Sequence, residues 1–482
     1  MNFNRSILSG LFWVGISVVL SRMFLFVSQL AMGILLEPKE FGAFAAVFGV
    51  SSFVAGLRNG GLQPYFIKHA LVGSRAEPSY INYSRVFNIC GGIFIVVGAM
   101  TLYRDEPLKW VMGWIIGVAF ALSVPGLRLR AQLASGLKFR ALGLVEMLLS
   151  AVKSLSAVGF ALLGFGAVSI ALPLLLVPLV EILIGTRQVR KAPAFKFERD
   201  WKPKLFRIFT RTRWLIVSSF VVSIVLFGDY FFLGVLVDAE TLGIYFFGCQ
   251  LASAFANLFA QAFQSVLMPS LRQIEGEVAL EEEFHRILTF ACMTIGYGCM
   301  ALLLVSPYAI VLFWGDKWVA AIPVAQVALA SLIVRLQVPI FYSLLESQGR
   351  WKGKARLQII DAITLVIFVI IGGYLGTLQS IIACVFSQRI LAGIFIVFLT
   401  MRQMDFRYGV VIKEYFMLIG VGVLFSAAFV FLGDFGLSEQ RSLLLAAYRI
   451  ALFSIIFTAV YGVFKGRDII VLLKLVKRKF IK

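Results

Sequence analysis

The sequence has little charge. Only 15% of its 482 residues are Asp, Glu, Lys or Arg, whereas about a quarter of the residues in an average soluble domain are charged. In contrast, 60% of the residues are hydrophobic and the mean hydropathy is +0.92. This composition excludes an ordinary soluble globular domain.

Residues and motifs typical of enzymes are also scarce. The five cysteines lie in apolar segments and the two histidines, His69 and His285, lie far apart in predicted loops, so we expect neither a disulfide framework nor a metal site. The chain lacks a phosphate-binding P-loop, an HExxH motif and a GxGxxG turn after a strand. The loops on the predicted outer side of the membrane are too short to form the catalytic domain that a membrane polymerase or ligase would carry. We therefore predict no catalytic residue, and no cofactor apart from a coupling H⁺ or Na⁺.

Long apolar runs dominate the sequence. They are roughly 18 to 27 residues long, the length that crosses about 30 Å of hydrocarbon as a helix. Runs such as 93–99 and 172–184 lack the alternation of barrel strands. The first run is too long for a signal-peptide core and has no small-residue cleavage site after it. We predict an all-α, polytopic membrane protein with about fourteen transmembrane helices.

The net charge of +20 is distributed unevenly among the loops. Most basic residues fall in one set of alternate loops, above all in 187–213 and after residue 464; the loop 128–140 of this set contains Arg128 and Arg130. The opposite set holds only Lys39, Arg104, Lys109, Lys317 and Arg441. The positive-inside rule predicts that both termini are cytoplasmic. This placement favours membrane lipids over nucleic acid as the partner of the charge.

The two halves of the chain contain a weak repeat. "LEPKEFGAFAAVFGVSSFVAGL" from Leu36 aligns with "VDAETLGIYFFGCQLASAFANL" from Val237, so that Gly42 aligns with Gly243. A second match joins 135–152 to 347–366. An even number of spans per repeat gives two lobes related by an axis along the membrane normal. We predict a six-helix lobe with a cytoplasmic hinge at 1–200, a second lobe at 201–405, two extra helices at 406–464 and a basic tail at 465–482.

Several basic residues lie inside the predicted spans, where a charge costs at least about 2.5 to 3.5 kcal/mol and needs a partner or water. Arg22, Lys153 and Arg389 are deep, at about 22, 18 and 17 Å along their spans at 1.5 Å per residue. Arg58 and Arg335 are nearer the cytoplasm and could snorkel to the interface. The alternatives are structural ion pairs or a cationic cavity that binds an anionic substrate.

Acidic residues accompany these arginines and lysines. Glu146, Asp229 and Asp361 are candidates for carrying a coupling ion, and Glu181 is a further acidic residue within a span. Glu146 and Lys153 are seven residues apart on one helix, beyond the usual i, i+4 contact. A direct pair between them would need a long rotamer reach.

Four stretches carry a resemblance to a known family. They are "FWGDKWVAAIPVAQVALASLIVRLQVPIFYSLLESQGRWKGKARLQII" (313–360), "LLEPKEFGAFA" (35–45), "LRAQLASGLKFRALGLVE" (129–146) and "FGDYFFLGVLVDAETLGIY" (227–245). The sequence resembles Wzx-type polysaccharide flippases of the multidrug/oligosaccharidyl-lipid/polysaccharide transporter superfamily, and the colanic-acid exporter branch is the most similar. The match covers most of residues 1–400.

The resemblance implies a function and a site. Family members translocate undecaprenyl-pyrophosphate-linked oligosaccharide repeat units across the bacterial inner membrane by alternating access through a cationic cavity between two six-helix lobes. It assigns Arg22 and Arg58 to that cavity, and Lys153 and Arg335 less directly. Arginine suits this role because its planar fork binds phosphate bidentately. The lipid II flippases and the cation-coupled drug exporters of the superfamily are the alternatives. We expect a monomer, with polysaccharide polymerase or export machinery as a further partner.

Overall fold

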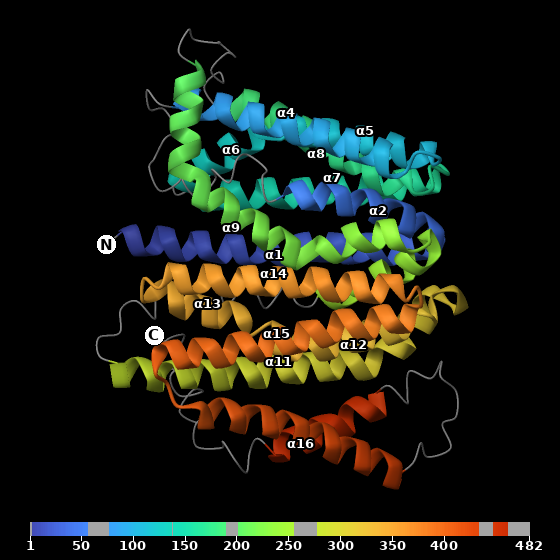
Figure 1. Ribbon diagram of the computed structural model, residues 1–482, viewed down its shortest axis with the longest axis vertical. Coiled ribbons are helices and arrows are strands. Elements are labelled where there is room, and N and C mark those ends of the chain that lie inside the picture. The colour runs from blue at the N-terminus through green and yellow to red at the C-terminus, as the bar shows by residue number, and fades with distance from the viewer. Residues whose placement is uncertain are drawn as a thin grey trace. The chain divides into compact units, whose positions relative to one another are not determined.

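A computed structural model shows a chain built of helices (Figure 1). The structure describes residues 2–55, 77–136, 138–188, 201–254, 277–432 and 447–460. Within these ranges no residue lies in a β-strand, which confirms the predicted all-α class. The helices are α1 (Asn2–Leu35), α2 (Pro38–Ala55), α4 (Glu77–Leu102), α5 (Pro107–Ala121), α6 (Val124–Ser135), α7 (Phe139–Leu162), α8 (Val168–Gln188), α9 (Trp201–Leu236), α11 (Glu277–Trp314), the 3₁₀ turn η2 (Asp316–Trp318), α12 (Ala321–Arg335), α13 (Val338–Ser347), α14 (Trp351–Tyr374), α15 (Leu378–Met404) and α16 (Tyr408–Leu432); residues 239–254 and 447–460 are helical as well.

Many of these helices can cross a bilayer. Among the described residues, seven are long and apolar enough to do so, or eight when the bent pair Pro107–Ala121 and Val124–Leu133 counts as one span. The chain is therefore a multi-pass membrane protein. The number of fourteen spans and the cytoplasmic position of the termini remain predictions.

The chain divides into two compact units. Unit 1 comprises Met1–Phe246 and Gln358–Ile381, and unit 2 comprises Phe247–Leu357 and Ile382–Lys482. The predicted domain boundaries near residues 200 and 405 remain predictions.

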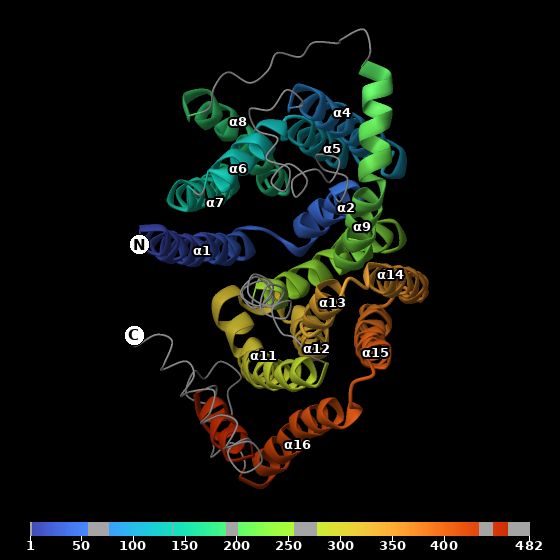
Figure 2. The same cartoon turned by 90° about the vertical axis from the view of Figure 1, so that its left-hand side faces the viewer.

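Unit 1 is built of pairs of neighbouring helices. α1 packs along α7, α2 along α9 and α4 along α5, and α8 lies against both α5 and α7 (Figure 2). At the start of α9, Ile208 and Ile216 join an apolar cluster with Tyr80, Val124 and other side chains of α4 and α6. This cluster fixes α4 and α6 beside each other.

Unit 2 has an apolar core between α11, α13 and α16. Phe284 on α11, Phe341 on α13 and Phe453 in the last described helix are almost fully buried there. Two hydrogen bonds cross this core: Thr289 Oγ1 donates to Glu414 Oε1 at 2.8 Å in a buried bond, and Tyr415 Oη donates to Gln337 Oε1 at 2.9 Å in a partly buried one.

The two glycines that the repeat aligns meet in unit 1. A Cβ added to Gly42 on α2 would lie 1.6 Å from the carbonyl oxygen of Ala239, and one added to Gly243 would lie 1.8 Å from the carbonyl oxygen of Pro38. Real Cβ atoms do not approach backbone atoms so closely. Glycine at both positions therefore lets α2 and the helix at 239–254 cross with their backbones in contact.

The two crossing helices begin with carboxylate caps. Glu40 accepts the backbone N–H of Glu37 at 2.8 Å, and Asp238 Oδ1 accepts the N–H groups of Glu240 and Thr241 at 2.9 and 3.0 Å. Burial raises the pKa of Asp238, but the hydrogen bonds from Thr241 and Glu240 lower it further, so the pKa lies below its ordinary value. An ionised carboxylate at this end stabilises the helix.

Two segments differ from the polar connections that the sequence suggests. The predicted hinge 187–213 is helical from Trp201 onward, because α9 continues as one helix to Leu236. Likewise His285 lies on α11, which begins at Glu277, rather than in a loop. Residues 189–200 and the predicted basic tail lie outside the described residues.

Candidate functional site

A break between α5 and α6 brings polar residues into unit 1. α5 ends at Ala121, α6 begins at Val124, and the two helices are bent by 41°. Pro125 in the first turn of α6 has no backbone N–H to continue the ladder of α5. The bend therefore has a covalent cause, and it redirects the chain from Val124 onward.

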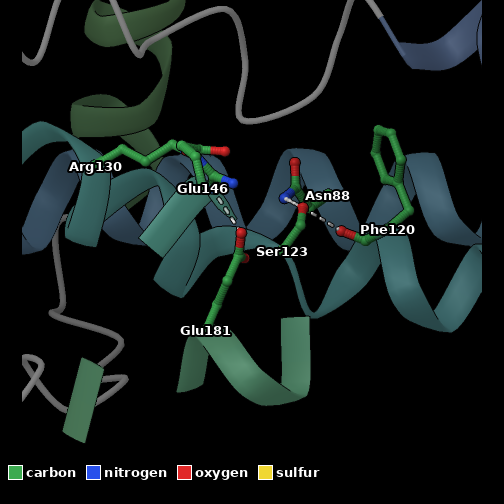
Figure 3. A network of polar contacts seen from close by, with 6 residues as sticks. All are labelled: Asn88, Phe120, Ser123, Arg130, Glu146 and Glu181. Carbon is green, nitrogen blue, oxygen red and sulfur yellow. Dashed lines mark hydrogen bonds and ion pairs between the residues drawn. The ribbon is translucent and has the colours of Figure 1, made fainter. Parts of the chain in front are cut away.

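The break is held by a buried chain of hydrogen bonds. Asn88 on α4, which is fully buried, donates from Nδ2 to Ser123 Oγ at 2.9 Å. Ser123 Oγ donates in turn to the carbonyl oxygen of Phe120 at 2.8 Å (Figure 3). A neighbouring helix thus supplies hydrogen-bonding capacity that the broken ladder loses.

Beyond the break, Arg130 on α6 joins two acidic residues from two other helices. Its Nε donates to Glu146 Oε1 on α7 and its Nη1 donates to Glu181 Oε1 on α8, both at 2.6 Å (Figure 3). The exposed fractions of the three side chains are 26% for Arg130, 44% for Glu146 and 1% for Glu181. We call Arg130, Glu146 and Glu181 the Arg130 cluster.

A second ion pair lies on the same helix. Arg128 Nε contacts Glu77 Oε1 on α4 at 2.5 Å, and the two side chains are only 11% and 6% exposed. The sequence placed Arg128 and Arg130 among the basic residues of a cytoplasmic loop. The structure corrects this, because both lie on α6 and both form ion pairs with other helices. It also shows that Glu146 contacts Arg130.

Arg22 and Lys153 lie on two helices that pack together. Ser28 Oγ on α1 donates to the carbonyl oxygen of Ser154 on α7 at 3.3 Å, which fixes the register of the pair. Arg22 is half-buried, and it makes no hydrogen bond or ion pair in the part of the chain that the structure describes. The side chain of Lys153 is exposed.

The remaining predicted basic residues lie in unit 2 or outside the described residues. Arg58 lies outside the described residues. In unit 2, Arg335 is half-buried at the end of α12, and the guanidinium of Arg389 on α15 lies 5.9 Å from the ring centroid of Phe386. A further arginine, Arg449, stacks over Tyr308 at 5.2 Å.

Two of the three predicted ion-coupling residues are deeply buried. Asp229 on α9 is fully buried, accepts a hydrogen bond from Tyr245 Oη at 2.7 Å and accepts the backbone N–H of Tyr230 at 3.1 Å. Asp361 on α14 is 2% exposed. Among the described residues no group of three or more His, Cys, Asp or Glu side chains could hold a metal ion.

Comparisons with solved structures identify the fold. The lipid II flippase MurJ in an inward closed conformation superposes with a TM-score of 0.72 at 12% identity, over 95% of this chain and 99% of that chain. An inward-facing MATE multidrug resistance transporter gives a TM-score of 0.58 at 16% identity, over 78% and 94%. A MOP superfamily transporter from Pyrococcus furiosus, described by a reverse polarity of its binding pocket, gives 0.52 at 18%, over 82% and 95%.

Sequence comparisons identify the family. No curated protein sequence matches this chain. A family model described as "Polysaccharide biosynthesis protein" matches residues 31–323, more than half of the chain. The chain therefore belongs to this family of polysaccharide biosynthesis proteins, and its helices have the fold of the MurJ and MATE transporters.

Proposed function

We propose that the protein is a flippase that moves undecaprenyl-pyrophosphate-linked oligosaccharide repeat units across the bacterial inner membrane, for exopolysaccharide, capsule or O-antigen assembly. The family match supports a role in polysaccharide biosynthesis, and the fold supports a transporter rather than an enzyme. Transport proceeds by alternating access through a cationic cavity, with both termini in the cytoplasm.

One observation carries the proposal. Arg22 is a permanent cation in the interior of an apolar helix, half-buried and without an ion pair in the described structure. A charge in this position is costly unless water or a ligand compensates it. A diphosphate suits it, because the guanidinium fork donates two parallel hydrogen bonds to phosphate oxygens.

The other intramembrane cations extend this assignment. Arg58, Lys153, Arg335 and Arg389 complete the proposed binding set, and Asp229, Glu146 and Asp361 carry the coupling H⁺ or Na⁺. The substrate is that of the colanic-acid exporter branch of the family. Flippases for lipid II are the second candidate because the MurJ fold covers nearly the whole chain. Cation-coupled drug exporters are the third, since MATE transporters share the fold.

The test is the pool of lipid-linked precursors in a strain that lacks the protein. We expect undecaprenyl-pyrophosphate oligosaccharide to accumulate on the cytoplasmic side, and the wild-type chain to relieve the accumulation. Arg22→Ala should fail to relieve it at equal protein level. Arg402→Ala is the matched control, because Arg402 is exposed at the end of α15. Accumulation of lipid II would favour the second candidate, and no accumulation would overturn the flippase assignment.

A further inference from the structure

The charges of the Arg130 cluster do not balance. Two carboxylates share one guanidinium, and in the described part of the chain neither Glu146 nor Glu181 contacts a second basic residue. With both carboxylates ionised the cluster carries one net negative charge. The neighbouring Arg128 is paired with Glu77, and Arg85 lies near Arg128; neither arginine contacts Glu146 or Glu181 in the described structure.

The excess charge is most costly at Glu181. Its side chain is 1% exposed, and Oε2 is a buried oxygen without a hydrogen-bond partner in the described structure. Glu146 is 44% exposed, so water can reach its carboxylate. A buried, unpartnered carboxylate oxygen is far less stable than a solvated one.

The space beside Glu181 Oε2 limits which cation can neutralise the charge of this carboxylate. A Cβ added to Gly126 on α6 would lie 2.0 Å from Glu181 Oε2 and 2.6 Å from Arg130 Nη1. The oxygen therefore faces a tight gap against the α6 backbone. A sodium ion needs several oxygen ligands around it, and the described residues contain no group of three or more His, Cys, Asp or Glu side chains that could hold a metal ion. A proton needs only the oxygen itself.

We infer that Glu181 is a proton-binding site, at which Oε2 takes up one proton from solvent and thereby removes the net negative charge of the Arg130 cluster. No bond other than the new O–H bond forms. The proton converts the contact between Glu181 and Arg130 from an ion pair into a weaker hydrogen bond between the guanidinium and an uncharged carboxylic acid. Proton uptake thus loosens α8 from α6, close to the break at Ser123.

On the helices that pack against α8, the described charged side chains other than Arg130 do not contact Glu181. On α7, Arg130 is the one charged partner of Glu146 among the described residues, and Lys153 is exposed. On α6, Arg128 is engaged by Glu77. Two other helices that contact α8 carry lysines in their first turns, and both lysines are paired. Lys109 on α5 pairs with Glu106, and Lys39 on α2 pairs with Glu240.

Infrared spectroscopy of the full chain in detergent tests the site directly. The carbonyl stretch of a protonated carboxylic acid is separate from that of a carboxylate and shifts on exchange into D₂O. In titrations between about pH 5 and pH 9 we expect the Glu181→Gln variant to lose one carboxylic-acid equivalent relative to the wild type. Glu283→Gln is the matched control and should retain it, because the Glu283 carboxylate is 47% exposed on α11 and lies outside the cluster. Equal spectra for wild type and Glu181→Gln would overturn the inference.

A second variant tests the site without removing either carboxylate. Gly126→Ala keeps both carboxylates but places a methyl group against Oε2, so it should shift the titration of the same band. An unshifted band in Gly126→Ala would also count against the site. The link to transport rests on the proposed function. There we expect Glu181→Gln to flatten the pH dependence of flipping, whereas the infrared result stands without any transport assay, so the two failures are distinguishable.

Discussion

Two helix pairs in the described residues, α5 with α6 and α12 with α13, are broken at the same local sequence but are stabilised by different interactions. In unit 1, α5 and α6 are separated at Leu122 and Ser123 and followed by Val124-Pro125. In unit 2, α12 and α13 are separated at Leu336 and Gln337 and followed by Val338-Pro339. Both second helices begin with the same dipeptide, so both breaks have the same local cause.

The difference lies in the side chains that each second helix carries after its proline. α6 carries Arg128 and Arg130, whose partners come from α4, α7 and α8, and its pair is bent by 41°. α13 instead buries Ile340, Phe341, Leu344 and Leu345, and Ala321–Ser347 counts as one span. A common backbone break thus supports a charged network in one unit and an apolar core in the other.

The largest effect should come from removing the shared guanidinium. Arg130→Ala leaves two carboxylates without their cation, and we expect the free energy of unfolding to fall by about 3 to 5 kcal/mol. Equilibrium denaturation in mixed micelles measures it. Arg130→Leu combined with Glu181→Leu should recover at least about 2 kcal/mol, because the buried charge is then gone as well. A double variant less stable than Arg130→Ala would contradict this account.

The corresponding change in unit 2 removes an apolar side chain and not a charge. Leu344 is fully buried on α13, so Leu344→Ala should cost about 2 to 5 kcal/mol through the cavity it leaves. Ile412→Ala is the control, since Ile412 is 52% exposed on α16, and it should change stability little in the same denaturation assay. A loss below about 1 kcal/mol for Leu344→Ala would show that α13 is not held by its apolar face.

A smaller effect should come from filling the gap beside Glu181. Gly126→Ala forces its methyl group against the carboxylate, and we expect a loss of about 1 to 3 kcal/mol from overpacking. Gly159→Ala on α7 is the matched change, because nothing lies within 4 Å of its added Cβ. There the better helix propensity of alanine should leave stability unchanged or slightly raised. Equal thermal midpoints for the two variants would mean that the gap is not tight.

The smallest effect should come from the hydrogen bond at the break of unit 2. Tyr415→Phe removes the hydroxyl that donates to Gln337 Oε1, at a cost of about 1 kcal/mol. Thermal unfolding of the full chain measures this shift. The control Tyr374→Phe changes a residue that is 86% exposed and should leave the midpoint unaltered. Identical midpoints would show that the break in unit 2 does not depend on this bond.

Much of the fold can be predicted from the sequence. Apolar length predicts the helices, since hydrocarbon thickness sets how long a span must be. The weak repeat predicts that Gly42 and Gly243 correspond, and the structure places them in contact. The hinge 187–213 was harder to predict, because the start of α9 carries enough basic residues to resemble a loop by charge alone.

The candidate site was less predictable. Glu146 lies seven residues from Lys153, too far for the usual contact along one helix, and the sequence names no other partner for it. The partner in the structure is Arg130, sixteen residues away and on another helix. Partners across helices leave no periodic signal in a single sequence. The one available signal was the presence of Glu146 and Glu181 in apolar spans, because buried carboxylates require a nearby cation.

At the crossing of α2 with the helix at 239–254, a second substitution cannot compensate for the loss of a glycine. At Gly42 and at Gly243 an added methyl group would strike a carbonyl oxygen of the opposing backbone, not a side chain. Shortening a side chain elsewhere cannot move that oxygen, so no second substitution nearby can make room. The two positions are therefore tied to glycine together, and a change at either one must be met by separating the helices themselves.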